Sequence, residues 1–393
     1  MTSEERREVR YRRRVEKRRI AKAQKTADAD DFAKVFSYAN LYQAYKCCRR
    51  NVSWKASVQR YISQAPLNIL HTYNRLMAGK YKTPGFYEFD LFERGKHRHI
   101  RSTVIGERVV QRCLCDYALV PMVSRSFIHD NGASLANKGY DFAIRRLTQH
   151  LHEHYRKYGQ EGYILLFDFL KFFDNVSHAV IKGILRNQFT DERIIQLTEH
   201  FIDAFGDVGL GLGSQISQVL ALSSANRLDH YIKEKARIRG YGRYMDDGYL
   251  IHHSKEHLQK CMKAIKILCK QLGIKLNEKK SQIVKLSHGF TWLKVRFYLT
   301  DTGKVIKKIY KRSVTKMRQK LKKFHQKWVD GKMSFEDVYV SCVSWSDGYA
   351  AKFNAYHTRQ SMLALFNQLF IGGTENAVYQ DHAGRNACGS GSP

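Results

Sequence analysis

The sequence predicts an α+β fold divided into two or three lobes. Apolar residues recur at helical spacing near both ends of the chain, whereas the centre contains apolar runs of strand length. The chain has 393 residues, and domains average roughly 150 residues. With 43% apolar residues, the chain can bury a core of ordinary size.

The N-terminal part is predicted to be helical, with one β-hairpin. Residues 36–82 show helical apolar spacing. The aromatic segment 86–92 is strand-like, and 93–101 is a turn followed by a basic strand, so the pair would present cations at its tip. Two further helices are predicted, over 104–120 before Pro121 and over 140–158.

The main strands are predicted in the centre of the chain. Residues 163–167 form a continuous apolar run, typical of a strand buried on both faces, which leads directly into Asp168. Residues 241–253 are predicted as two short strands joined by a tight turn at residues 246–248. Carboxylates therefore stand at the ends of predicted strands.

Helices are predicted again in the C-terminal part. Residues 258–272 form an amphipathic helix closed by Gly273. A basic helical region over 304–332 and further helix over 338–370 follow. The first 26 residues are instead dense in Arg and Lys without apolar residues at helical spacing, so we expect a solvated arm or an exposed helix.

The charge balance indicates a polyanionic partner. Lys and Arg total 68 against 36 Asp and Glu, a formal net charge of +32, which exceeds what solubility requires. Nucleic acid fits better than a membrane, because no apolar run approaches the roughly 18 residues of a spanning helix and charge follows Met1. The cytoplasm is the expected compartment. The basic N-terminal segment would be a phosphate-binding arm, the alternative being a solubilising tail.

Other classes of nucleic-acid-binding protein fit less well. The eight cysteines show no paired C-x-x-C spacing, which argues against a zinc-finger protein and favours reduced thiols. Aromatic residues make up 12% of the chain, which argues against a disordered polycation.

Three carboxylates carry the predicted chemistry. Asp168, Asp246 and Asp247 each lie at the end of a predicted strand, and they converge if these strands are neighbours in one sheet. Their repulsion must then be relieved by a raised pKa or a divalent cation, and oxygen-only ligands favour Mg²⁺ over zinc. Two Mg²⁺ ions about 3.5–4 Å apart would support in-line nucleotidyl transfer. The alternative for an isolated Asp-Asp pair is a polar turn.

The motifs resemble those of reverse transcriptases. The resemblance covers roughly residues 52–370, and its central elements are the sequence FDFLKFF at 167–173 and YMDD at 244–247. Supporting segments are RHIR at 98–101, ERVVQ at 107–111, 209–218, GFTWLK at 289–294 and a basic helical region after them. The resemblance implies a right-hand polymerase fold with fingers, a palm built on a small antiparallel sheet with helices, and a helical thumb.

This resemblance also implies a division of the chain. We expect a basic N-terminal arm over 1–35, fingers with a helical lead-in over 36–160, a palm over 161–300 interleaved with the fingers, and a thumb over 301–370. The remaining tail, 371–393, ends in Gly-Ser-Gly-Ser-Pro, which is typical of an expression linker.

Within this family, the segment 212–218 resembles the reverse transcriptases of bacterial and phage diversity-generating retroelements. Leu212-Gly213 and Ser217-Gln218 stand where most lineages, including group II introns and retrons, have Gln-Gly and Ser-Pro. The change accompanies adenine-directed errors in that family. A Gln can hydrogen-bond the nucleotide sugar whereas Leu cannot, and a lost hydrogen bond costs about 1 kcal/mol. Gly211 departs from the pattern, since proline is usual there.

The resemblance assigns roles at the reaction centre. Asp168, Asp246 and Asp247 would be catalytic and hold two Mg²⁺ ions, with Mn²⁺ as a substitute, and the Phe169 carbonyl would be an added ligand. Phe173 would be the steric gate that excludes a ribose 2′-OH. The other expected nucleotide-binding residues are Lys96, Arg98, Arg101, Lys171, Phe172, Leu212 and Gly213. Core packing is the alternative for one of Phe172 and Phe173, and a solvated hairpin for the fingers cations.

Primer and template contacts are implied for a second group of residues. Tyr244 and Met245 would lie beside the primer terminus, and Trp292, Leu293 and Lys294 would form the primer grip, although Trp292 also fits a hydrophobic anchor. Lys311 and Arg312 belong to a series of cations, with Lys307, Lys308, Lys316, Lys320 and Lys323, spaced three or four apart. On a helix they would form a stripe that tracks a template-primer duplex, the alternative being a solvated face.

The leading hypothesis is an error-prone RNA-directed DNA polymerase that copies an element-encoded RNA. Its partners would be template RNA, the primer-template duplex, dNTPs and an accessory protein or structured non-coding RNA, without a membrane. One alternative is an antiphage defence reverse transcriptase that works with a non-coding RNA. Another, from a different class, is a non-catalytic RNA-binding scaffold with the polymerase fold.

Overall fold

The computed structural model describes residues 2–93, 96–211 and 213–371. The chain forms two compact units. The first contains Met1–His150 and Tyr163–Ile283, and the second contains Leu151–Gly162 and Val284–Pro393. In the part of the chain that the structure describes, no helix has the length and apolar character needed to cross a membrane.

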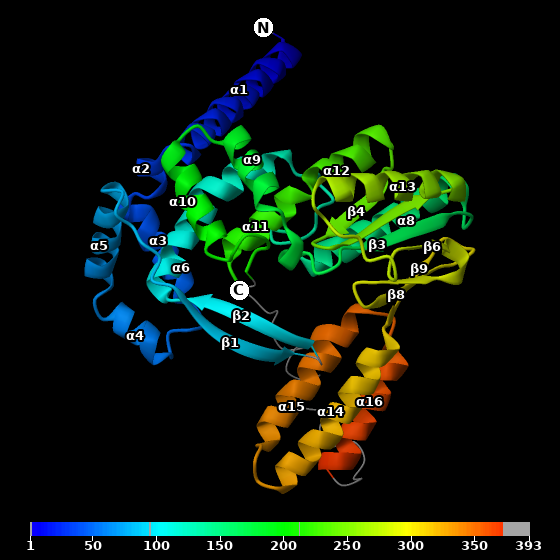
Figure 1. Cartoon of the computed structure of the whole chain (residues 1–393). Coiled ribbons are helices and arrows are strands. Elements are labelled where there is room, and N and C mark those ends of the chain that lie inside the picture. The colour runs from blue at the N-terminus through cyan, green and yellow to red at the C-terminus, as the bar shows by residue number, and fades with distance from the viewer. Residues whose placement is uncertain (1, 94–95, 212, 372–393) are drawn as a thin grey trace. The chain divides into compact units, whose positions relative to one another are not determined.

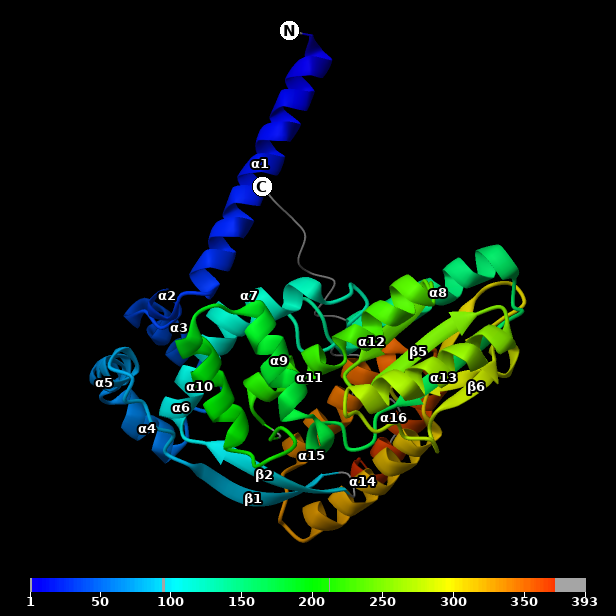
Figure 2. The same cartoon turned by 45° about the horizontal axis from the view of Figure 1, so that its top comes forward.

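Helices open the first unit, and those within residues 36–82 are predicted from apolar spacing. They are α1 (Ser3–Ala29), α2 (Phe32–Val35), α3 (Tyr38–Cys48), α4 (Ala56–Ile62) and α5 (Ala65–Met77). Thr2 and Glu5 form a capping box that begins α1. Figures 1 and 2 show α1 extending away from the rest of the unit, while its C-terminal end lies against α2 and α7. The exposed-helix expectation for the basic N-terminus is confirmed.

The predicted hairpin and the helices after it follow. Strands β1 (Phe86–Glu93) and β2 (Lys96–Thr103) pair antiparallel. Then come α6 (Ile105–Leu114), the π-helix η1 (Cys115–Leu119), α7 (Val120–Val123), the 3₁₀ turn η2 (Ser124–Ser126) and α8 (Tyr140–Tyr158). The predicted helix end before Pro121 is wrong. The chain continues helically through η1 into α7, because Pro121 stands in the first turn of α7, where its missing N–H is tolerated.

A four-stranded sheet forms the centre of the chain. Its strand order is β4 (Gly240–Tyr244), β5 (Asp247–His252), β3 (Tyr163–Asp168) and β6 (Gln282–Lys285). The surrounding helices are η3 (Phe173–Asn175), α9 (His178–Gln188), α10 (Glu192–Asp203), α11 (Gln215–Ser224), α12 (Asn226–His230), η4 (Tyr231–Lys235) and α13 (Lys255–Gln271). Helix α13 packs against β3 and β5. It is followed by Gly273 at φ +69°, as the sequence predicts.

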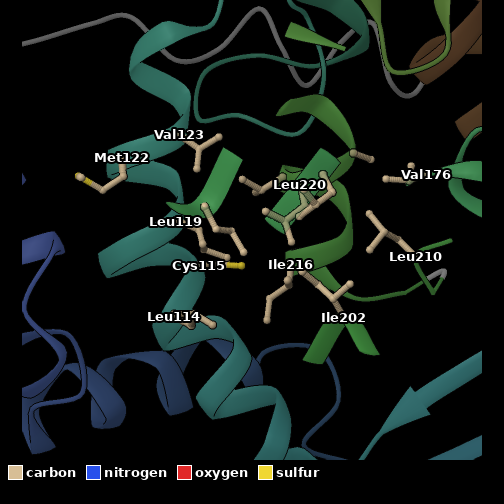
Figure 3. Packing of buried hydrophobic residues seen from close by; sticks show 14 of the residues in the cluster. Leu114, Cys115, Leu119, Met122, Val123, Val176, Ile202, Leu210, Ile216 and Leu220 are labelled. Atoms are coloured by element: carbon tan, nitrogen blue, oxygen red, sulfur yellow. The ribbon is translucent and has the colours of Figure 1, made fainter. Parts of the chain in front are cut away.

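One hydrophobic core runs through the first unit. It joins side chains from α2 and α3 to those of the central strands and of α9–α13. Figure 3 shows part of it, where Cys115 and Leu119 of η1 face Ile216 and Leu220 of α11. This packing holds the helices next to the sheet and thereby sets the position of the strand ends.

The second unit combines a small sheet with a helical bundle. Its elements are η5 (Leu286–His288), β7 (Phe290–Trp292), β8 (Val295–Leu299), β9 (Val305–Ile309), α14 (Lys311–Val329), α15 (Phe335–Val343), η6 (Ser344–Tyr349), η7 (Ala350–Lys352) and α16 (Tyr356–Phe370). The three strands pair antiparallel in chain order. Helices α14, α15 and α16 bury an apolar cluster between them.

The helix predicted from residue 304 begins later. Residues 305–309 are strand β9, which pairs with β8, so Lys307 and Lys308 lie on a strand. Lysines spaced three and four residues apart continue from β9 into α14, so the sequence pattern alone predicts a single helix over both segments. Residues 305–309 form a strand because they pair with β8 and because β-branched Val305, Ile306 and Ile309 favour a strand.

Candidate active site

Two neighbouring strands bring predicted acidic residues together. Strand β3 pairs antiparallel with β5, and the register places Asp168 opposite Asp247. Strand β3 is buried from Ile164 to Asp168, as expected for a strand covered on both faces. Asp168 is only 5% exposed. Like charges directly opposite each other on adjacent strands repel, so this pairing requires compensation.

The turn between β4 and β5 positions Asp246. Tyr244 pairs with Asp247, which leaves Met245 and Asp246 as a two-residue loop. The predicted turn at residues 246–248 is therefore wrong, because Asp247 and Gly248 already belong to β5. Met245 has φ +53°, as the first loop residue of a type II′ turn does.

Gly248 allows the close packing behind the carboxylates. It stands opposite Phe167 in the register of β3 and β5. A Cβ atom at Gly248 would lie 2.2 Å from the Phe167 ring, far inside van der Waals contact. The ring can cover the strand beside Asp247 only because residue 248 has no side chain.

A cationic side chain compensates part of the negative charge. Lys280 Nζ lies 2.7 Å from Asp168 Oδ2, and Asn277 Nδ2 donates to Asp168 Oδ1 at 2.8 Å. The Asn277 N–H also donates to the Asp168 carbonyl. Sequence reasoning missed both residues, since Asn277 and Lys280 lie in a polar segment without a motif.

Asp247 experiences the remaining repulsion. Burial raises its pKa, the negative charges of Asp246 and Asp168 raise it further, and Lys280 lowers it, giving a value of about 7. The shift shows that burial, together with the two neighbouring carboxylates, disfavours the charged form of Asp247.

The chemistry of these residues fits a divalent cation. The arrangement of the side chains is a separate matter: among the residues that the structure describes, no group of three or more His, Cys, Asp or Glu is already placed as a metal site. The fit therefore concerns the chemistry of the donors. The donor set consists of three carboxylates that supply oxygen alone, which suits Mg²⁺. The Lys280 ammonium already lies beside Asp168 as a counter-charge, and Asp247 has a raised pKa. Additional positive charge would therefore be bound favourably at this position.

The loop after β3 contains the predicted nucleotide contacts. Phe169 N–H donates to the Asp246 carbonyl at 3.1 Å, which ties the loop to the β4–β5 turn. Lys171 is exposed and has φ +44°, an uncommon conformation for a residue with a side chain. Phe172 is buried against Phe169, with ring centroids 5.1 Å apart, whereas Phe173 is half-buried. Of the two candidate rings, Phe172 is thus the one that packs in the core.

The cations that the resemblance assigns to the fingers lie on β2. The register places Lys96 opposite Glu93 and Arg98 opposite Leu91. Arg101 pairs with Glu88 at 3.0 Å and donates to the Phe205 carbonyl at 3.3 Å. Arg101 is therefore partly neutralised within the hairpin region.

The segment before α11 is anchored to α6. Leu212 lies outside the described residues, while Gly213 is exposed with φ +103°. The next residue, Ser214, is buried, and its hydroxyl donates to Gln111 Oε1 at 3.0 Å. Gln111 Nε2 in turn donates to Glu107 at 2.8 Å. This chain of hydrogen bonds fixes the C-terminal side of the predicted nucleotide-binding loop.

Gly211 departs from the retroelement pattern for a local reason. A Cβ atom at this position would lie 1.9 Å from the Phe205 ring. The ring stacks on Phe86 of β1, with centroids 4.9 Å apart. A proline here would require that ring to move.

The predicted primer-contacting residues fall in different parts of the molecule. Tyr244 and Met245 lie at the β4–β5 turn beside Asp246. Trp292 ends β7 and is buried, and Leu293 and Lys294 form a two-residue turn in which both φ angles are positive, +46° and +63°, as in a type I′ hairpin. Lys311 and Arg312, which the resemblance assigns to the thumb, begin α14. The residues from Trp292 onward, namely Trp292, Leu293, Lys294, Lys311 and Arg312, belong to the second unit.

The fold and the site together define a palm of the right-hand polymerase type, a small antiparallel sheet with helices and with three carboxylates at its strand ends. Residues 93–302 match the family described as reverse transcriptase (RNA-dependent DNA polymerase). That segment is more than half of the 393 residues, and it contains all three carboxylates. The chain belongs to this reverse transcriptase family.

Two solved telomerase structures show a low similarity to the chain. The first is telomerase from Candida albicans in complex with a TWJ fragment of telomeric RNA, with TM-score 0.45, 10% identity and coverage of 78% of this chain and 65% of that one. The second is apo telomerase from Candida tropicalis truncated from its C-terminal domain, with TM-score 0.41, 15% identity and coverage of 62% and 60%. The chain thus spans less than two thirds of either structure. No curated protein matches it in sequence.

Proposed function

We propose that this chain is an RNA-directed DNA polymerase that extends a primer on an RNA template by nucleotidyl transfer. The observation that carries the proposal is the placement of Asp168 opposite Asp247, with Asp246 in the adjoining turn. Membership of the reverse transcriptase family supports it.

In this proposal the three carboxylates and the Phe169 carbonyl hold two Mg²⁺ ions. When bound, such ions lower the pKa of an attacking hydroxyl and stabilise the leaving oxygen. Asp168 is restrained by Asn277 and Lys280, so its carboxylate is held in place before metal binding. The Lys280 side chain is 60% exposed and can therefore move aside into solvent.

Nucleotide and primer contacts extend the proposal. The backbone amide of Lys171, an exposed residue, and the cations of β2 would face the triphosphate, and the half-buried Phe173 ring would exclude a ribose 2′-OH. Tyr244 and Met245 would contact the primer end. The hairpin turn at Leu293 and Lys294, and Lys311 and Arg312 at the start of α14, would bind the primer-template backbone. The division into arm, fingers, palm, thumb and tail belongs to the same proposal.

A finer proposal is that the enzyme acts in a diversity-generating retroelement and copies its template with errors. Leu212-Gly213 and Ser217-Gln218 support this role. Helix α11 buries Ser217, and Gln218 accepts a hydrogen bond from Ser134 at 3.0 Å. A glutamine thus stands where many lineages have a proline, and its side chain ties α11 to the segment near residue 134.

The activity is tested with purified protein, a primed RNA and dNTPs. We expect Mg²⁺-dependent cDNA, which the double variant Asp246→Asn with Asp247→Asn abolishes, because the metal ligands become neutral. Glu192→Gln, an exposed carboxylate at the start of α10, is the matched control and should remain active. A double variant with wild-type activity contradicts the site, and an inactive wild type that still binds RNA indicates a scaffold.

The biological role is tested by sequencing the cDNA made in the native host. Errors concentrated at template adenines support the retroelement role. A homopolymer, or a product copied from an adjacent structured RNA without repeats, supports antiphage defence instead. Co-purification from the same cells identifies the accessory protein or RNA that the excess positive charge leads us to expect.

A further inference from the structure

A buried arginine supports the β4–β5 turn from within the protein. Arg243, in β4, has a side chain with 0% exposure. Its Nη1 donates to the Met245 carbonyl at 2.7 Å, and its Nη2 donates to the Leu222 carbonyl at 3.1 Å. The guanidinium group therefore connects the turn that contains Asp246 to the end of helix α11.

Arg243 is held in turn by Asp229 of α12. Nε donates to Asp229 Oδ1 at 2.8 Å and Nη2 to Oδ2 at 2.6 Å, a two-point contact between fully buried side chains. The Tyr241 hydroxyl also donates to Asp229 Oδ1. The main chain of Arg243 is fixed as well, since its N–H donates to the Asp130 carbonyl and its carbonyl accepts from the Gly132 N–H.

Such a pair is a costly way to stabilise a core. Removing two charges from water costs several kcal/mol per ion, and apolar replacements of similar volume are often neutral or stabilising. Three hydrogen bonds join Asp229 to Arg243 and Tyr241. A fourth joins Arg243 to the adjacent turn. The network reaches the turn through the hydrogen bond from Arg243 to the Met245 carbonyl, so a fixed Arg243 holds that carbonyl in one place.

The turn requires external support. Met245 has φ +53°, and a non-glycine residue in this region is strained by about 1–3 kcal/mol. The two loop carbonyls are both fixed, that of Met245 by Arg243 and that of Asp246 by the Phe169 N–H. Without one of these donors, the loop could relax and change the direction of the Asp246 side chain.

We propose that Arg243, held by Asp229, is a positioning residue that fixes the Met245-Asp246 turn and so aligns Asp246 and Asp247 for metal binding. This inference rests on the proposed function. It assigns Arg243 no contact with substrate, and its effect is transmitted through the Met245 carbonyl.

The substitution Arg243→Lys tests the geometry while it keeps the charge. A lysine has one ammonium group, which cannot contact both Asp229 oxygens and the Met245 carbonyl in the planar arrangement of arginine. Partners outside the ligand sphere typically change metal affinity or activity by about 10–100-fold. We expect the half-saturating Mn²⁺ concentration to rise and kcat to fall in that range, while KM for dNTP changes less than about twofold.

Two milder variants and a control complete the experiment. Asp229→Asn weakens the support of Arg243, and Tyr241→Phe removes one hydrogen bond from Asp229 and keeps both charges, so its effect should be smaller. Arg112→Lys is the matched control, because Arg112 of α6 pairs with Asp116 of η1, a residue outside the network of Arg243 described above. It should lower thermal stability without raising the Mn²⁺ requirement.

Metal binding is measured by titrating Mn²⁺ into the full-length protein bound to a primer-template, and unfolding temperatures are recorded for every variant. The inference is overturned if Arg243→Lys or, where that variant does not fold, Tyr241→Phe binds Mn²⁺ as wild type does. An equal Mn²⁺ shift in Arg112→Lys also overturns it. If wild type makes no cDNA, the proposed function fails, and the comparison of Mn²⁺ binding still decides the role of Arg243.

Discussion

At the scale of single residues, the site is governed by carboxylates that repel one another. Asp168 and Asp247 are register partners, and Asp246 adjoins them. At Asp168, hydrogen bonds from Lys280 and Asn277 compensate the negative charge. At Asp247, the pKa is raised to about 7. Below about pH 7, the free protein therefore holds a proton at Asp247, where the proposed function requires a cation.

This proton makes stability depend on pH. The unfolded Asp247 has a pKa of 3.8 and the folded group one of about 7. Because the folded state binds the extra proton between these values, its contribution to stability is complete below about pH 4 and is lost as the pH rises to about 7. We expect the unfolding free energy of wild type minus that of Asp247→Asn to fall across this range in metal-free buffer. Urea denaturation measures it, and a flat difference contradicts the assignment.

Substitutions of the neighbouring Phe172 and Phe173 should affect different properties, the first mainly stability and the second mainly sugar selection. Phe172 is buried in the core, so Phe172→Ala should destabilise the protein by about 3–5 kcal/mol. Phe173 is half-buried, and Phe173→Ala should cost less stability and increase incorporation of ribonucleotides. Unfolding curves and extension assays with rNTPs or dNTPs compare the pair. Unchanged sugar selectivity in Phe173→Ala would exclude the steric-gate role.

At the scale of elements, the side chains of α1 that the structure describes form no apolar face that could account for the length of this helix by packing. Residues 6–25 contain eleven Lys or Arg and two Glu, and Tyr11 and Ile20 are exposed. Its C-terminal end is attached through contacts such as that of Arg125 with Thr26. A helix of this composition fits the backbone of an RNA better than the interior of a protein.

Neutralising exposed cations of α1 should weaken RNA binding. Arg12, Arg13 and Arg14 are exposed, and changing all three to Gln keeps helix propensity while it removes charge. For each lost phosphate contact, the slope of log K against log salt should decrease by about 0.7–0.9. The same change at Lys260, Lys263 and Lys270 of α13 is the control. Equal slopes for wild type and the α1 variant, measured by filter binding, would identify α1 as a solvated helix.

At the scale of the whole molecule, the net charge of +32 acts on stability as well as on binding. Excess like charge destabilises a compact protein through self-repulsion. Salt reduces this repulsion, but it also weakens the binding of a polyanion.

The free and bound protein should therefore respond to salt in opposite directions. We expect the Tm of the free protein to rise with added NaCl, because repulsion is screened. The Tm of the complex with an RNA-DNA duplex should fall, because ligand stabilisation declines with affinity. Differential scanning fluorimetry at low and high salt measures both. Parallel changes would show that the duplex does not neutralise the excess charge.

Local sequence determined much of this protein. The sequence patterns of side-chain period, turn residues and charge predict the apolar run before Asp168, the aromatic hairpin, the helix over residues 140–158 and the basic N-terminal helix. They also predict a helix over 258–272, which the structure has as α13, Lys255–Gln271. These features depend on neighbours within a few residues, which a sequence pattern records directly. The reverse transcriptase family was also recognisable from short motifs around the acidic residues.

Only the tertiary structure decided how the acidic site is supported. Strand register, and not the Asp-Asp-Gly pattern, places the turn at Met245 and Asp246. Pairing with β8 makes residues 305–309 a strand despite the helical lysine spacing. Asn277, Lys280, Asp229 and Arg243 meet the site from distant segments. Burial gives each of these contacts its strength, and burial arises only when segments far apart in the sequence pack together.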